Sequence, residues 1–212
     1  MAGEYQSLRI GLCGAQGTGK TTLARIAAQS LMVPFIQTNV ADILRRNGVV
    51  SCRSEMPVME RLALQEIILN GIVDALPREG EFITDRTPLD VMMYTLSWLP
   101  PFPDEEVSEA VKSLLDRCVD ATDDHFSLIT QLHPGIELPR KEFERTDRAP
   151  LNFACCTRED ALLTGIIRRY SRFILNCRLT SIPVSVVRLD MRVNALEKLA
   201  DINFAPLHDP FH

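Results

Sequence analysis

Short apolar runs alternate along the chain with longer segments whose apolar residues keep helical spacing. The apolar runs predict β-strands at 8–13, 33–37, 81–84, 126–132 and 184–189. Between them, apolar residues that recur every three or four positions predict helices at 22–31, 40–46, 57–76, 88–98, 104–119, 159–179 and 195–201. Strands that alternate with helices in this way predict a parallel sheet with helices on both faces.

The alternation also indicates where a ligand binds. We expect one domain over residues 1–212, with three layers and a five-stranded parallel sheet in the order 2-3-1-4-5. Ligands of such sheets bind at the carboxyl ends of the strands. The residues that directly follow the strands are therefore the first functional candidates, and they are 14–21, Thr38-Asn39, Asp85-Arg86 and His133.

The loop after the first predicted strand carries the most specific motif. Residues 14–21 follow the phosphate-binding pattern G-x-x-x-x-G-K-T, with a predicted strand before and a predicted helix after. Its glycines let successive N–H groups face one anion, and the helix adds its positive end. We expect Lys20 to project from a solvent-facing loop towards the β- and γ-phosphates and the Thr21 hydroxyl to bind Mg²⁺. The expected ATP-binding residues are Gly14, Ala15, Gln16, Gly17, Thr18, Gly19, Lys20, Thr21 and Thr22. The fold class that follows is a P-loop NTPase.

Two charged residues end the third predicted strand. Asp85 is expected to face the metal and the γ-phosphate, where it either binds Mg²⁺ or accepts the proton of an attacking hydroxyl. Arg86 is expected to neutralise charge on the transferred group or on the acceptor. In the alternative interpretation, Asp85 only caps the helix that begins near Pro88.

The segment 134–152 is polar and has the composition of a lid. It lies between a predicted strand and a predicted helix, and its basic residues gather in one stretch. Phosphoryl transfer needs cations over the γ-phosphate and exclusion of water. We expect Arg145 and Arg148 to supply those cations, and a solvated charged loop is the alternative.

Other candidates are residues that would flank an acceptor. Asn39, Asp42, Glu55 and Arg61 are expected near the acceptor, although each alone also fits a helix cap or a surface position. Tyr94 and Trp98 keep helical spacing, which favours a place in the core. Stacking of these aromatic residues on a base is the alternative.

Charge and cysteine content limit the kinds of partner and metal site that we expect. The net charge of -5 argues mildly against a protein whose main partner is nucleic acid. If the acceptor is a base in DNA, the basic residues from Arg140 to Arg178 should form one face beside the Asp85 edge of the sheet. The six cysteines lack C-x-x-C spacing, so reduced thiols and no structural metal are expected. No signal-like start or membrane-length apolar run occurs, so we expect a cytoplasmic protein without a membrane partner, and a homodimer is compatible with the sequence.

Residues 11–23 and 84–91 together resemble a known group of kinases. They look like the small P-loop kinases related to the nicotinamide-riboside kinase domain of bacterial NadR proteins, and particularly like their phage-encoded relatives. The resemblance is strong over the first hundred residues and loose beyond them. It implies a P-loop fold of the nucleoside and nucleotide kinase type. It also implies an Asp85–Arg86 pair, a lid with arginines, ATP and Mg²⁺ as cofactors, and a nucleotide-type acceptor. Some phage members phosphorylate the hydroxymethyl group of 5-hydroxymethyluracil in DNA, and a phage-encoded protein would work in the host cytoplasm.

The sequence is therefore compatible with three functions. The first expectation is transfer of the ATP γ-phosphoryl group to 5-hydroxymethyluracil in phage DNA. The second is a kinase of a free nucleoside or nucleoside monophosphate. The third is a regulatory switch operated by ATP or GTP. The chain has no N-K-x-D motif for guanine, and its arginine-rich segment 134–152 favours transfer over a switch.

Overall fold

Strands and helices alternate throughout the part of the chain that the computed structural model describes, residues 7–49, 56–134 and 153–204. The strands are β1 (Arg9–Cys13), β2 (Phe35–Ile36), β3 (Phe82–Thr84), β4 (Leu128–Leu132) and β5 (Arg178–Ile182). The helices are α1 (Lys20–Leu31), α2 (Val40–Arg46), α3 (Val58–Ala75), α4 (Pro88–Trp98), α5 (Glu105–His125), α6 (Phe153–Tyr170) and α7 (Leu189–Phe204).

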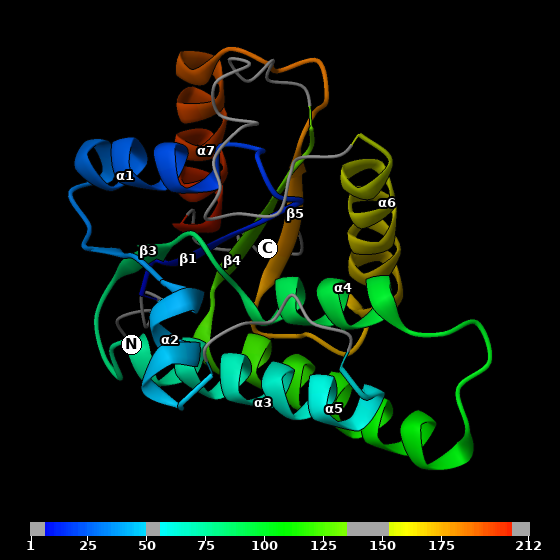
Figure 1. The fold of residues 1–212 in the computed structure, drawn as a ribbon. Coiled ribbons are helices and arrows are strands. Elements are labelled where there is room, and N and C mark those ends of the chain that lie inside the picture. The colour runs from blue at the N-terminus through cyan, green and yellow to red at the C-terminus, as the bar shows by residue number, and fades with distance from the viewer. Residues whose placement is uncertain (1–6, 50–55, 135–152, 205–212) are drawn as a thin grey trace, which may run out of the picture.

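The five strands form one parallel sheet in the order β2-β3-β1-β4-β5. The predicted fold class and strand order are therefore confirmed. β1 lies at the centre, where Ile10 pairs with Ile83 of β3 and with Leu128 of β4. Because all strands run in one direction, the residues that follow β1, β3 and β4 meet at one edge of the sheet (Figure 1).

Helices cover both faces of the sheet (Figure 1). On one face, Ile10 and Leu12 of β1 pack with buried residues of α1 and α7. On the other face, Cys13 and Phe82 pack with buried residues of α3, α4, α5 and α6. Burial on both faces explains why the strands read as continuous apolar runs and not as alternating patterns.

The fifth strand lies six residues before its predicted position. The run 184–189 was predicted as a strand because it is rich in valine, but β5 is Arg178–Ile182. Pro183 follows that strand directly, and its carbonyl accepts the N–H of Val186 in a turn. The side chains of Val184 and Val187 are exposed. β5 is an edge strand with one neighbour, so it needs less apolar sequence than the central strands.

The predicted helix 159–179 is correct only in part, because α6 begins at Phe153 and ends at Tyr170. The carboxylate of Asp123 accepts the N–H groups of both Leu175 and Asn176 at 2.6 Å. This contact holds the chain in a turn before β5, and a pattern along the sequence does not show it. α5 and α7 are longer than predicted, since they extend to His125 and begin at Leu189.

Some expectations lie outside the described residues. The predicted lid is one of them, with Arg145 and Arg148, because only its first residue, Pro134, is described. Glu55 and Cys52 are also outside. Within the described part, Cys13, Cys118 and Cys177 are buried. None of the described helices is both long and apolar enough to cross a bilayer.

Candidate active site

The loop between β1 and α1 has a backbone that only glycines adopt easily. Gly17 and Gly19 have φ angles of 81° and 85°, and Gly19 is the N-cap of α1. At Gly14, a Cβ atom would lie 2.5 Å from the carbonyl oxygen of Leu132. The three glycines therefore allow the tight loop, here called the phosphate loop (residues 14–21), that the motif predicts.

Lys20 is buried, which corrects the expectation that it projects from a solvent-facing loop. Its side chain folds over the phosphate loop, and Nζ donates to the carbonyl oxygens of Gly14 at 2.6 Å and Ala15 at 3.0 Å. Only 6% of the residue is exposed. Burial, together with the positive charge of Arg86, lowers the pKa of Lys20 to about 8. The ammonium group therefore lies inside the loop that is expected to bind phosphate.

Asp85 meets the phosphate loop at the edge of the sheet. Its Oδ2 accepts a hydrogen bond from the Thr21 hydroxyl at 2.5 Å, and its Oδ1 accepts the N–H of Thr38 at 3.1 Å. The residue is 5% exposed. The two residues predicted to bind Mg²⁺ thus touch each other, and both offer oxygen, the ligand atom that Mg²⁺ prefers.

Asp85 does not cap α4, so the capping interpretation is wrong. Thr87 is the N-cap of α4 and forms a capping box with Asp90. Oδ2 of Asp90 accepts the N–H of Thr87 at 2.9 Å, while Oδ1 accepts the N–H of Gly14 at 3.2 Å. Asp90 therefore joins α4 to the phosphate loop. Sequence reasoning missed this role, although the T-x-x-D pattern of a capping box was visible.

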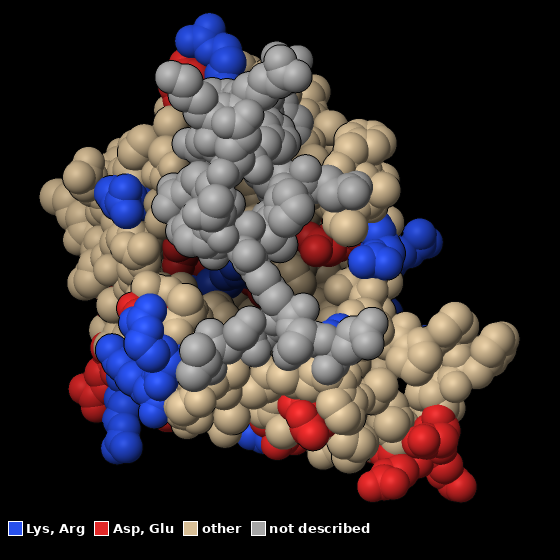
Figure 2. Space-filling view, viewed as in Figure 1, with Lys and Arg blue, Asp and Glu red and all other residues tan. Residues whose placement is uncertain are grey.

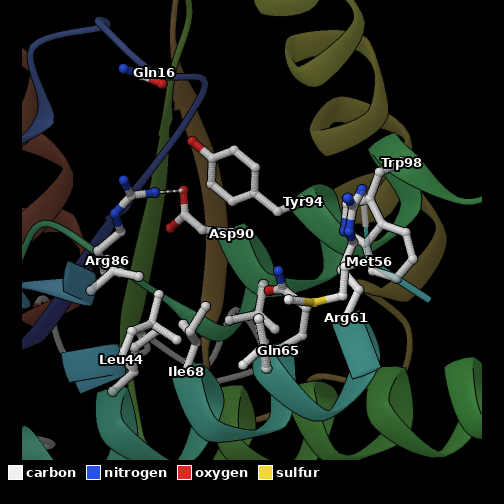
Figure 3. A pocket seen from close by; sticks show the side chains of 14 residues that line it. Gln16, Leu44, Met56, Arg61, Gln65, Ile68, Arg86, Asp90, Tyr94 and Trp98 are labelled. Carbon is white, nitrogen blue, oxygen red and sulfur yellow. Dashed lines mark ion pairs between the residues drawn. The ribbon is translucent and has the colours of Figure 1, made fainter. Parts of the chain in front are cut away.

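Arg86 points its guanidinium group toward Asp90, with Tyr94 nearby (Figure 3). Its Nη1 is 3.9 Å from Oδ1 of Asp90, and its guanidinium carbon is 5.4 Å from the centre of the Tyr94 ring. Burial opposes the charge of Arg86, but Tyr94 and Asp90 outweigh it and hold the pKa of Arg86 above its ordinary value. Arg86 therefore presents a permanent positive charge next to Asp85.

A cavity of about 440 Å³ opens beside these residues. Its walls come from the phosphate loop, α2, α3, α4 and the residues before α3 (Figure 3). Apolar and aromatic side chains line most of it, with a few polar groups among them. The lining residues are Gln16, Val40, Leu44, Met56, Arg61, Leu64, Gln65, Ile68, Ile72, Arg86, Asp90, Val91, Tyr94 and Trp98.

Of the predicted acceptor residues that are described, Arg61 alone lines the cavity. Its guanidinium carbon lies 5.2 Å from the centre of the Trp98 ring. Tyr94 and Trp98 line the cavity and also pack against the core, so the two interpretations of these residues are compatible. Asn39 and Asp42 are not among the lining residues, and they pair with each other at 2.6 Å at the start of α2.

Glu159 of α6 also approaches the phosphate loop. Its Oε2 is 3.4 Å from the backbone nitrogen of Gln16. Burial raises the pKa of Glu159, although the Gln16 N–H and the charge of Lys20 oppose the increase. Sequence analysis did not identify this residue, because nothing in the local pattern of α6 indicates a contact 143 residues away.

Three of the described arginines do not lie on the basic face expected beside Asp85. Arg178 pairs with Leu128 at the first residue of β4, so it lies at the amino edge of the sheet. Arg168 and Arg169 are in the last turn of α6, which leads into that edge. Basic side chains lie in separate groups on the face shown in Figure 2. That expectation is wrong for these three arginines, and Arg140, Lys141, Arg145 and Arg148 lie outside the described residues.

Comparison with known proteins agrees with this geometry. The model of the AAA family, described as ATPases associated with various cellular activities, matches residues 10–73, which include the phosphate loop. No curated protein matches the chain in sequence. Among solved structures, deoxyadenosine kinase from M. mycoides is 11% identical with a TM-score of 0.59, covering 92% of this chain and all of that one.

Two further structures are similar in fold. NadR in complex with NR is 18% identical with a TM-score of 0.62, covering 92% of this chain and 51% of NadR. This chain thus spans about half the length of NadR. Thymidylate kinase from Candida albicans is 16% identical with a TM-score of 0.51, covering 93% of this chain and 92% of the kinase. The chain therefore has the fold of nucleoside and nucleotide kinases.

Proposed function

We propose that the protein is an ATP-dependent kinase that transfers the γ-phosphoryl group to a hydroxyl of a nucleoside-type acceptor. One observation carries the proposal. The cavity has Gln16 of the phosphate loop and Arg86, the neighbour of Asp85, in its wall. A molecule bound there lies against the loop that would hold the phosphates of ATP. Donor and acceptor sites that meet at a carboxylate and an arginine are what phosphoryl transfer requires.

The donor site is formed by the phosphate loop. Its N–H groups and the start of α1 would bind the phosphates, with Lys20 adding a positive charge from within the loop. Thr21 and Asp85 would hold Mg²⁺, whose remaining ligands are commonly water and phosphate oxygens. When bound, the ion neutralises charge on the β- and γ-phosphates.

Asp85 and Arg86 would act on the transferred group. Two hydrogen bonds fix the carboxylate of Asp85, so its orientation is set before a ligand binds. From there it would orient the acceptor hydroxyl and take its proton, or act through the metal. Arg86 keeps its charge at all physiological pH values and faces the same cavity, where it would stabilise the negative charge of the transferring oxygens.

The cavity fits an acceptor with a flat apolar ring and a polar edge. Tyr94 and Trp98 offer aromatic surfaces, and the Gln65 amide offers one donor group and one acceptor group to a base edge. Its volume of about 440 Å³ lies within the range of roughly 300–1,000 Å³ that is usual for small-molecule sites. A nucleoside has these chemical features and this order of size.

A free nucleoside or nucleoside monophosphate is the acceptor that the described residues support better. A base in DNA would have to leave its strand to enter the cavity, and its backbone would need cations nearby. Arg168, Arg169 and Arg178 lie towards the opposite edge of the sheet. The hydroxymethyl group of 5-hydroxymethyluracil in DNA, which the sequence resemblance favours, is the second acceptor to test.

A panel of acceptors tests the proposal. The protein is incubated with Mg²⁺ and ATP labelled in the γ-phosphoryl group, and with nucleosides, nucleoside monophosphates or hydroxymethylated DNA. Asp85→Asn serves as the matched control. Label on one of the small acceptors, present with the natural protein and lost with the variant, supports the proposal. Label only in inorganic phosphate, with every acceptor, contradicts it and favours an ATP-operated switch.

A further inference from the structure

A buried arginine of α7 lies behind the phosphate loop. Arg192 is 2% exposed and is among the largest fully buried side chains of the described residues. Its Nη1 donates to the carbonyl oxygen of Thr18 at 2.8 Å. Its Nη2 donates to the carbonyl oxygen of His133 at 3.1 Å, and its Nε to that of Val186 at 2.8 Å. One guanidinium thus joins the phosphate loop, the end of β4 and the connection between β5 and α7.

The partners of Arg192 are unusual for a buried charge. Within the described residues they are backbone carbonyl oxygens, and no described ion pair neutralises the guanidinium. A buried charge without a carboxylate is costly, so a purely structural position would favour an apolar residue. The charge is useful where it adds to a binding site for anions, and the phosphate loop is such a site.

The hydrogen bond to Thr18 acts on the loop directly. The Thr18 carbonyl and the Gly19 N–H belong to the same peptide group, and a charged donor on the carbonyl polarises that group. The bond also holds the loop from the rear, on the side where a carbonyl points away from the N–H groups that would face phosphate. Both effects strengthen a site for the phosphates of a nucleotide.

We propose that Arg192 is a positioning residue that holds the phosphate loop in its nucleotide-binding shape and thereby sets the affinity for ATP. It acts through Thr18 and touches neither donor nor acceptor. The inference rests on the proposed ATP-binding function. It adds that a residue of α7, 174 positions along the chain from Thr18, determines nucleotide affinity.

The test measures the dissociation constant of Mg²⁺ and AMP-PNP, a non-hydrolysable ATP analogue, by titration calorimetry. Arg192→Met removes the charge and all three bonds, while Arg192→Lys keeps a charge without the fork. Arg188→Met is the matched control, because Arg188 lies four residues earlier, is exposed and pairs with Asp190. Asp104→Ala removes the N-cap of α5, far from the loop, and serves as a control for lost stability.

We expect Arg192→Met to weaken analogue binding by about tenfold or more, because bonds from a charged donor are lost. Arg192→Lys should fall between that variant and the natural protein, and both controls should bind as the natural protein does. A third variant, Arg192→Ala, leaves space for a guanidinium ion. Added guanidinium ion should partly restore the binding of the analogue to this variant. Equal binding by Arg192→Met, or an equal loss in Asp104→Ala, overturns the inference alone. A natural protein that binds no analogue overturns the proposed function, and this inference with it.

Discussion

The Thr21 hydroxyl donates a hydrogen bond of 2.5 Å to the carboxylate of Asp85. The two residues are 64 positions apart in the chain, and each follows a different strand of the sheet. β1 and β3 are neighbours and parallel, so the residues after them meet at the same edge. The contact brings the predicted donor site and the predicted catalytic carboxylate to one point.

Asp85→Asn should abolish most phosphoryl transfer while leaving nucleotide binding. The amide matches the carboxylate in shape and can still accept the Thr38 N–H, but it takes no proton and binds Mg²⁺ poorly. We expect turnover to fall by roughly 10²–10⁴-fold. The measurements are turnover, nucleotide affinity and the thermal midpoint. Asp85 is structural if affinity and midpoint fall together with turnover.

Lys20 should make stability depend on pH in a defined window. Its pKa is about 8 in the folded protein, below the ordinary value of 10.5. Between these two pH values the unfolded chain binds more protons, so the Lys20 contribution to stability rises with pH and is least favourable below pH 8. The difference corresponds to roughly 3 kcal/mol. Burial raises the pKa of the Cys13 thiol, so the contribution of Cys13 to stability falls as the pH rises, opposite to that of Lys20.

Comparison with Lys20→Met isolates this contribution. The free energy of unfolding of the natural protein, relative to the variant, should increase from about pH 8 to 10.5. Denaturant titrations at several pH values measure it. A constant difference between the two proteins across this window means that Lys20 is not buried as a charge.

Features of the fold and the site could be predicted from the sequence where they depend on local contacts or on a regular repeat. The phosphate loop is one contiguous motif, and the alternation of strand and helix patterns predicted the parallel sheet. Asp85 was found because it directly follows a strand. β5 was misplaced because the valine-rich run after Pro183 has a stronger strand pattern than the edge strand itself.

Arg192 shows what the sequence pattern left out. Its partners are carbonyl groups of distant residues, which no motif encodes. One signal was present, because Arg192 shares a helical face with Leu196 and Ala200, which are buried. An arginine on an apolar face indicates a buried partner, but α7 was predicted to begin only at residue 195. Most of the cavity wall was also missed, since it comes from segments that meet only in the folded chain.

The cavity wall should control the acceptor and not ATP. Trp98→Ala removes an aromatic surface, and Gln65→Leu removes hydrogen-bonding groups at similar size. Each should raise the KM for the acceptor by about tenfold, given about 1–3 kcal/mol for a stacked base. The KM for ATP should stay unchanged. The matched control is Asn70→Leu on α3, whose amide contacts Arg117 outside the cavity. A change in the KM for ATP alone contradicts the assignment of the cavity.

The salt dependence of activity distinguishes the two candidate acceptors, a free nucleoside and a base in DNA. Binding of DNA through several phosphates weakens by roughly 10³-fold or more between about 50 and 200 mM salt, because counterions are released. A free nucleoside carries no phosphate, so its KM should change little over that range. We expect the weak dependence, measured from initial rates at fixed ATP. A steep dependence with hydroxymethylated DNA as the better acceptor contradicts the preference for a small acceptor.

The fate of the γ-phosphoryl group tests the central claim most directly. With labelled ATP, Mg²⁺ and the acceptor panel, the label is divided between acceptor and inorganic phosphate, and the two are separated and counted. A kinase should place most of the label on one acceptor, and removal of that acceptor should stop most ATP consumption. Label that appears in inorganic phosphate at the same rate with and without every acceptor would contradict the account.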